Sequence, residues 1–275
     1  MTPVLSAGVD VAKAGDYVRS RQTSDGGFFF ARVPPATASD TYYALSALGL
    51  LGLEPKDRPA ARGWIEEAAS DDGVSNPRTL FHLCSAGALL GVPEESRRHW
   101  AERVRRFENP FGGFGAWECF DPEVTSELET THYAVEALTG AGLDFDRQRV
   151  VEFVRRLQNA DGGFGCGGCS TLPSTYLGVA VLVRLGIGRK AVHSVSGWLQ
   201  CYEKRYQVSY IEELYWLVAA LRILDRPLSN PPRAAAFVQA CQLPSGGFSR
   251  TIFGIASLEC THYALQILRL LQGDT

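Results

Sequence analysis

The chain alternates between two kinds of helical pattern. In the first kind, apolar side chains recur at helical spacing and charged side chains fill the other positions, which predicts an amphipathic helix with one face in water. Residues 94–108 show the type, because Trp100 and Val104 recur at this spacing among arginines and glutamates. We predict such helices at approximately Val9–Gln22, Ala60–Ser70, Pro93–Phe107, Arg147–Gln158, Lys190–Cys201 and Pro231–Gln242.

The second kind of pattern follows each amphipathic helix and is apolar nearly all round. Residues 176–186, YLGVAVLVRLG, and residues 215–224, YWLVAALRIL, are examples. A helix of this composition must be buried on most of its sides. Strand patterns are nearly absent, so we expect an all-α fold in which six outer helices surround six inner helices, an (α/α)6 toroid. The alternative is an open right-handed solenoid, but the inner helices are too apolar for its exposed concave face.

The helix pairs are copies of one repeat. Its turn reads QTSDGGFFF from Gln22, QNADGGFG from Gln158 and QLPSGGF from Gln242, and PFGGF at residues 110–114. The helix after each turn carries a threonine in one column, and two weaker copies carry leucine there: Thr41, Leu80, Thr131, Thr175, Leu214 and Thr261. These positions are roughly 39–51 residues apart, a period typical of repeat architectures. We therefore predict one domain over residues 1–275, with turns that need glycine and a phenylalanine filling each hairpin base.

Composition narrows the class of protein. The 275 residues are 45% hydrophobic and 21% charged, with a net charge of −3, which is ordinary for a soluble protein and gives no electrostatic reason to bind nucleic acid. Seven cysteines, mostly in apolar patterns, favour a reducing compartment over a disulfide framework. No export leader and no apolar run long enough to span a membrane is recognised, so we expect a cytoplasmic protein.

The repeat resembles a known superfamily. The motif Gln-x-x-Asp-Gly-Gly-Phe, followed by Thr-Tyr/His-Tyr-Ala-Leu/Val, is similar to the repeat of protein prenyltransferase β subunits and of squalene–hopene, oxidosqualene and class II diterpene cyclases. Four good copies and two degraded ones cover nearly the whole chain. The resemblance implies an α–α toroid whose central cavity holds an isoprenoid.

The two branches of this superfamily imply different chemistry. Protein prenyltransferase β subunits hold zinc with Asp-x-Cys at the start of one inner helix and His at the next. The Asp-x-Cys positions read Glu129/Thr131, Glu212/Leu214 and Glu259/Thr261 here, and the His position in the last repeat is Cys260. The zinc site is therefore not carried over, and the arginine-rich diphosphate loop is reduced to Arg250.

Class II cyclases use Asp-x-Asp-Asp directly before the threonine column, where the middle Asp protonates an alkene. The windows here read TASD, ELET, YIEE and SLEC, with Glu129, Glu212 and Glu259 at the middle position and Asp40 and Glu213 at the last. Because all inner helices start at one end of a toroid, we expect these five candidate catalytic acids to converge and to raise one another's pKa. The alternative is that first-turn acids only stabilise helix dipoles, by about 0.3–1 kcal/mol each.

Aromatic residues lie within a turn of these acids. Such rings would fit a prenyl chain and stabilise a carbocation through their π faces, or they would simply fill the centre of the toroid. The predicted substrate-binding residues are Tyr43, Tyr133, Trp216, Tyr263, His132, His262, Arg250 and, on a long loop, Trp117. The histidines are alternatively core residues, and the single Cys166-Gly-Gly-Cys169 pair is weak support for a metal site.

The leading hypothesis is an isoprenoid-processing enzyme that binds a polyprenyl substrate centrally and acts through rim carboxylates, as a class II terpene cyclase does. One alternative is a prenyltransferase acting on a prenyl diphosphate, which would require Mg²⁺ or Zn²⁺. The other is a non-catalytic toroid that binds a lipid or a partner protein. The sequence leaves open peripheral membrane contact, a second subunit and self-association.

Overall fold

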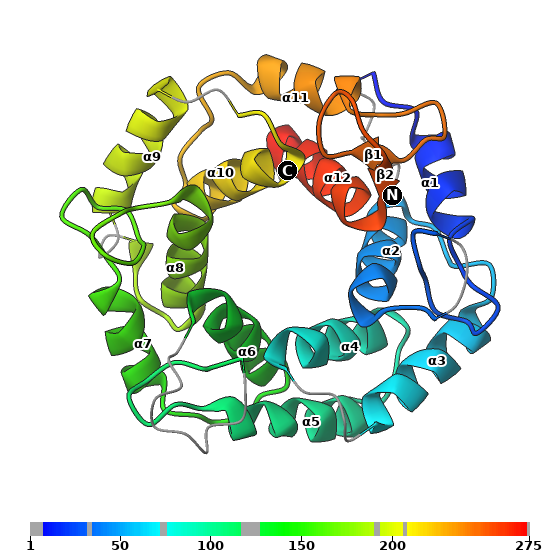
Figure 1. Cartoon of the computed structure of the whole chain (residues 1–275), viewed down its shortest axis with the longest axis horizontal. Coiled ribbons are helices and arrows are strands. Elements are labelled where there is room, and N and C mark those ends of the chain that lie inside the picture. The colour runs from blue at the N-terminus through cyan, green and yellow to red at the C-terminus, as the bar shows by residue number, and fades with distance from the viewer. Residues whose placement is uncertain are drawn as a thin grey trace.

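The computed structural model of the chain describes residues 8–31, 35–71, 76–116, 127–189, 193–205 and 208–273. Helices dominate this part of the chain, and they form two concentric layers around a hollow centre (Figure 1). The inner layer consists of α2 (Ala38–Leu51), α4 (Pro77–Leu89), α6 (Leu128–Gly140), α8 (Leu172–Arg184), α10 (Ile211–Ile223) and α12 (Leu258–Gln272). The outer layer consists of α1 (Val11–Arg19), α3 (Arg58–Ser70), α5 (Glu94–Glu102), α7 (Arg147–Arg156), α9 (Ser194–Arg205) and α11 (Pro231–Ala240).

The inner layer is a closed ring. Each inner helix packs against the next one in sequence, and α12 packs against α2. The prediction of an (α/α)6 toroid is therefore confirmed, and the open solenoid was the wrong alternative. None of the described helices combines the length and apolar character that crossing a membrane requires.

Two outer helices differ from the predicted boundaries. The segment predicted as one helix at Pro93–Phe107 is α5 followed by a 3₁₀-helix, η1 (Arg103–Phe107). A 3₁₀ turn is a common way for an α-helix to end. Helix α9 begins and ends later in the sequence than predicted. It spans Ser194–Arg205, and the basic residues Lys204 and Arg205 form its last turn.

The repeated phenylalanine and threonine are bonded to each other. The backbone N–H of Phe28 donates to Oγ1 of Thr41 at 3.0 Å. The same bond joins Phe164 to Thr175 at 3.0 Å, and it recurs at the two remaining turns. All four phenylalanine rings are fully buried, so they fill the hairpin bases as predicted.

The repeated glutamine links one outer helix to the next. The side-chain amide of Gln22 donates to the Asp57 carbonyl at 2.7 Å and accepts from the Asp57 N–H at 2.9 Å. Gln242 binds the backbone of Asp10 in the same way, at 2.9 and 2.8 Å, and so connects the last repeat to the first. Both aspartates are N-cap residues, so this glutamine ties each turn to the start of the neighbouring helix.

One turn shows why glycine is required. Gly246 has φ +91°, and a Cβ there would lie 2.1 Å from the Lys13 carbonyl oxygen of α1. A side chain is excluded both by this backbone conformation and by the close packing of the turn on α1. The paired glycines thus have the structural role that their position predicted.

A small hairpin is the main departure from an all-helical chain. Strands β1 (Phe248–Ser249) and β2 (Ala256–Ser257) pair antiparallel, with Phe248 opposite Ser257. The Arg250 carbonyl accepts a hydrogen bond from the N–H of Ile211, which fixes the hairpin to the start of α10. The hairpin thereby brings Arg250 to the edge of the hollow centre.

Candidate functional site

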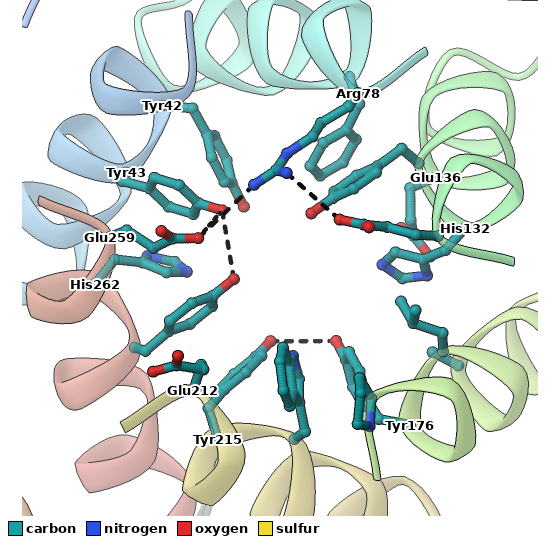
Figure 2. Close-up of a pocket in the computed structure, with 18 of the residues that line it drawn as sticks. Tyr42, Tyr43, Arg78, His132, Glu136, Tyr176, Glu212, Tyr215, Glu259 and His262 are labelled. Atoms are coloured by element: carbon teal, nitrogen blue, oxygen red, sulfur yellow. Dashed lines mark hydrogen bonds and ion pairs between the residues drawn. The ribbon is translucent and has the colours of Figure 1, made fainter. Parts of the chain in front are cut away.

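The centre of the ring is a cavity of about 1310 Å³. All six inner helices contribute to its lining, and the β1–β2 hairpin adds Arg250. Figure 2 shows the side chains pointing inward around an open middle. The aromatic residues therefore do not fill the centre of the toroid. The centre is a cavity that could hold a ligand, and it is not a packed core.

Eight of the 26 residues that line the cavity are phenylalanine, tryptophan or tyrosine. The rings of Tyr215 and Tyr263 stack with their centroids 4.7 Å apart, and those of Tyr42 and His82 stack at 5.0 Å. All the predicted substrate-binding aromatic residues of the inner helices line the cavity, namely Tyr43, Tyr133, Trp216 and Tyr263. Trp117 lies outside the described residues.

The three middle-position glutamates line the cavity together, but each is paired with a guanidinium. Arg78 Nη1 lies 3.4 Å from Oε1 of Glu129, and Arg78 Nη2 lies 3.7 Å from Oε1 of Glu259. Arg250 donates to Glu212, and its guanidinium also stacks on the ring of Tyr210 at 4.2 Å. Arg78 lies between Glu129 and Glu259, so these two carboxylates each face a cation. Among the five acids, an effect of one carboxylate on another is resolved at Asp40, whose pKa is raised by burial and also by the charge of Glu259.

The other two candidate acids face away from the central cavity. Asp40 accepts from the backbone N–H of Phe30 at 3.3 Å, and burial raises its pKa. Glu213 accepts from the N–H of Ser209 at 3.3 Å and lines a separate pocket of about 780 Å³. The reason is geometric: each stands one residue beyond the middle position, and one residue turns the side chain by about 100° around a helix.

Arg78 is the central residue that sequence reasoning missed. It occupies the middle-acid position of the second repeat, two residues before Leu80, so a full reading of that column would have found it. Its guanidinium also lies over the Tyr133 ring at 5.4 Å. The signal was overlooked because the column was searched for carboxylates alone.

Three histidines form part of the wall. His132 and His262 line the cavity as predicted, and His82 of α4 joins them. Burial lowers the pKa of His82 and His262 to about 3 and that of His132 to about 4, so all three imidazoles are neutral at physiological pH. The rings of His82 and His262 pack against the ring of Tyr43, with centroids 5.4 and 5.2 Å apart. One buried ring nitrogen of each of the three histidines has no hydrogen-bond partner among the described residues.

A carboxylate lies deeper in the cavity. Glu136 of α6 lines it, and Arg184 Nε of α8 lies 3.5 Å from its Oε1. Burial raises the pKa of Glu136, and the nearby Arg184 guanidinium lowers it to a smaller extent. Nearby, the hydroxyls of Tyr176 and Tyr215 are 3.3 Å apart (Figure 2).

The positions that hold zinc in protein prenyltransferases do not fit a metal here. Thr131 Oγ1 and Thr261 Oγ1 accept from phenylalanine N–H groups of the turns, and Leu214 is buried. Within the described part of the chain, no group of three or more His, Cys, Asp or Glu side chains is arranged to hold a metal ion. Cys166 and Cys169 are exposed free thiols at a turn.

Comparison with solved structures supports the toroid fold. The protein geranylgeranyltransferase-I of Candida albicans, complexed with GGPP, has a TM-score of 0.74 at 15% identity, over 95% of this chain and 91% of that chain. A substituted form of the type II terpene cyclase MstE from Scytonema, in complex with the substrate geranylgeranyl dihydroxybenzoate, has a TM-score of 0.65 at 12% identity over 97% of both chains. Unliganded MstE gives 0.61 at 13% identity over 98% of both chains.

Sequence comparison identifies the family. No curated protein sequence matches the chain. The sequence profile of the prenyltransferase alpha-alpha toroid domain, however, matches residues 2–73, 64–204 and 193–275. Together these matches span the repeats from the first to the last, and the chain belongs to the prenyltransferase alpha-alpha toroid domain family.

Proposed function

We propose that this protein binds an isoprenoid in its central cavity and cyclises it, starting with proton transfer from a carboxyl group of the cavity. The observation that carries the proposal is the size and lining of that cavity. At about 1310 Å³ it exceeds the roughly 300–1,000 Å³ of ordinary small-molecule pockets, and eight phenylalanine, tryptophan and tyrosine residues line it. A flexible polyprenyl chain would be folded against these rings, whose π faces would stabilise a carbocation.

The structural relatives support this substrate class. The Candida albicans enzyme was solved with GGPP, and MstE was solved with geranylgeranyl dihydroxybenzoate. Both ligands carry a geranylgeranyl chain, and each protein has the toroid architecture of this chain. Binding of a polyprenyl chain by this protein is an inference from the shared fold together with the aromatic cavity.

The charges of the lining favour an isoprenoid without a diphosphate. Four glutamates line the cavity against three arginines, so the net charge of these groups is −1 when all four are ionised and zero when Glu136 carries a proton. Each of these arginines lies within ion-pair distance of a lining glutamate: Arg78 with Glu129 and Glu259, Arg184 with Glu136, and Arg250 with Glu212. A diphosphate at the rim would have to break the pairs that Arg78 and Arg250 form with glutamates.

The rim glutamates position two arginines at the entrance of the cavity. Glu129 and Glu259 hold Arg78 across the opening, and Glu212 holds Arg250 at the hairpin. Glu129, Glu212 and Glu259 remain candidate proton donors from the sequence pattern. Their replacement one at a time by glutamine, followed by product analysis, tests that role directly.

The test uses isotope incorporation. The protein is incubated in D₂O with geranylgeraniol, with farnesol and, in parallel, with farnesyl and geranylgeranyl diphosphates with or without Mg²⁺. Cyclisation begun by an exchangeable carboxyl proton is expected to give an isomeric product that carries one added deuterium on carbon. Mass spectrometry and NMR identify such a product and the labelled position.

Other outcomes separate the alternatives. Loss of diphosphate with transfer of the prenyl group to an acceptor, dependent on Mg²⁺ or Zn²⁺, would favour the prenyltransferase. Binding of ligand that is recovered unchanged and unlabelled would indicate a non-catalytic toroid. Either result would overturn the cyclase proposal.

A further inference from the structure

We propose that Glu136, which the sequence pattern did not select, is the carboxyl group that donates the proton in the cyclisation. The inference rests on the proposed function and names the residue that performs its first step. It depends on the depth of Glu136 in the cavity, on its contacts and on its surroundings.

Helix α6 places Glu136 directly inward from the rim. It follows Glu129 by seven residues, which is about two helical turns or ~10 Å along the axis on the same face. His132 lies between them on that face, and all three residues line the cavity. Glu136 is thus the inner end of a polar stripe that runs along α6 from the opening.

The side chain of Glu136 is more enclosed than those of the two rim glutamates near it. Its exposed fraction is 26%, against 56% for Glu129 and 44% for Glu259. The side chain of Glu212 is more enclosed still, at 16%, but it accepts a hydrogen bond from Arg250. A carboxyl group in such surroundings keeps its proton to higher pH than one in water. Burial accordingly raises the pKa of Glu136, which is the direction that proton donation near neutral pH requires.

The groups that face Glu136 leave the carboxyl free to react. Arg184 Nε donates to Thr139 Oγ1 at 2.9 Å and is farther, at 3.5 Å, from Glu136 Oε1. Within the described part of the chain, no hydrogen bond to the Glu136 carboxyl is formed. Its carboxyl is therefore held near a cation without being tied into a bidentate pair.

The remaining titratable neighbours stay neutral. Tyr42 of α2, Tyr176 of α8 and Tyr215 of α10 interact electrostatically with Glu136, and burial raises the pKa of each tyrosine. His132 of α6 is neutral for the reason given above. Helix α6 also packs against α4, which adds Arg78 and His82 to the lining, and against α5 and η1 of the outer layer, which contribute no residue to it.

The chemical step balances without a further reagent. The O–H bond of the Glu136 carboxyl breaks, and its proton forms a C–H bond with one carbon of a terminal isoprene double bond. The tertiary cation left on the other carbon is captured by the next double bond, which forms the ring C–C bond. The final cation loses a proton to water, and the Glu136 carboxylate regains one from water in the open cavity, so the product is an isomer of the substrate.

The first test removes the acid and keeps the shape. Glu136→Gln is expected to lower turnover of geranylgeraniol by about 10²–10⁴-fold, the usual contribution of a positioned acid. Binding of geranylgeraniol, followed by quenching of the tryptophan fluorescence, should stay within about threefold of the wild type. The matched control is Glu152→Gln on outer helix α7, where Glu152 accepts only from Gln148, and this variant should keep full activity.

The second test shifts the pH profile. Arg184 lowers the pKa of Glu136, so Arg184→Gln should raise it, and the alkaline limb of the turnover profile should move to higher pH. A purely structural role of Glu136 would not move this limb. Infrared spectroscopy provides a readout independent of turnover: the protonated-carboxyl C=O band lost in Glu136→Gln should persist to higher pH in Arg184→Gln.

The outcomes distinguish this inference from the function on which it rests. Full deuterium incorporation by Glu136→Gln, or an unmoved alkaline limb in Arg184→Gln, would overturn the assignment of Glu136 and leave the cyclase intact. Loss of activity in only a rim variant, such as Glu212→Gln, would transfer the role to that residue. A wild-type protein that forms no labelled product from any isoprenoid would overturn the proposed function, and this inference with it.

Discussion

The four intact repeats and the two degraded ones differ in what they contribute to the molecule. The intact repeats carry a glycine turn, a buried phenylalanine and a buried threonine that bonds it. The degraded repeats, whose inner helices are α4 and α10, have Leu80 and Leu214 in the threonine column. Yet α4 supplies Arg78 and α10 supplies Glu212 to the cavity. The repeated motif therefore marks the scaffold, and the chemistry of the site varies independently of it.

The degraded repeats lack both the Gly-Gly-Phe motif and the threonine. A buried donor left without its acceptor costs about 1–3 kcal/mol, whereas removing both partners can be nearly neutral. Leu80 and Leu214 are both buried and need no hydrogen bond. This explains why turn and threonine are present together or absent together along the chain.

The largest expected effect breaks an intact repeat. Phe164→Ala removes a fully buried ring that packs against Gly178 of α8, and it should lower the free energy of unfolding by about 3–5 kcal/mol. Urea denaturation followed by circular dichroism measures the change. Phe111→Ala is the control, because that ring is 71% exposed and its loss should change stability little. Equal effects at the two sites would contradict the role of the turn phenylalanine as a core residue.

A smaller effect tests the bond itself. Thr175→Val keeps the shape and removes the acceptor of the Phe164 N–H, so the free energy of unfolding should fall by about 1–3 kcal/mol. In the degraded repeat the reverse change, Leu80→Thr, should also destabilise, because it puts a hydroxyl group in place of a fully buried apolar side chain. A stable Thr175→Val variant in the same urea experiment would show that the bond contributes little.

The smallest effect on stability is expected at the rim. Arg78 and its two glutamate partners are each 44–56% exposed, so solvent screens their attraction. Exposed ion pairs contribute about 0–1 kcal/mol, and Arg78→Leu should change the free energy of unfolding by no more than that. A double-mutant cycle of Arg78→Leu with Glu129→Gln, measured by urea denaturation, checks the pair. A coupling energy well above 1 kcal/mol would show that the rim ion pairs stabilise the fold, and it would contradict the distinction between scaffold residues and site residues.

The fold was predictable because it follows from repeated local patterns. Helical periodicity and the alternation of amphipathic with apolar helices specify two layers, and inner helices too apolar for an exposed concave face favour a closed ring over an open solenoid. The inward direction of Glu129, Glu212 and Glu259 followed from their shared column. Pairing of the repeated phenylalanine with the repeated threonine was open to inference from their common absence, although only the structure shows the bond.

The electrostatics of the site could not be predicted from the column alone. A residue's neighbours across a ring come from helices far apart in sequence, so the contact of Arg78 with Glu259 has no local signature. Asp40 and Glu213 were misplaced because an offset of one residue turns a helical side chain to another face. Glu136 was missed because it lies outside the acid column, and only the structure shows that it lines the cavity beside Arg184.

Joining the first repeat to the last also has a kinetic consequence. Gln242 binds the backbone of Asp10 across 232 positions of sequence. Bringing such distant segments together carries a loop-closure entropy that no single hairpin incurs, and contacts of this range form slowly. We therefore expect the packing of α12 against α2 to limit the rate of folding. A ligand bound in the central cavity would contact both α12 and α2, and by mass action its binding would stabilise the closed ring.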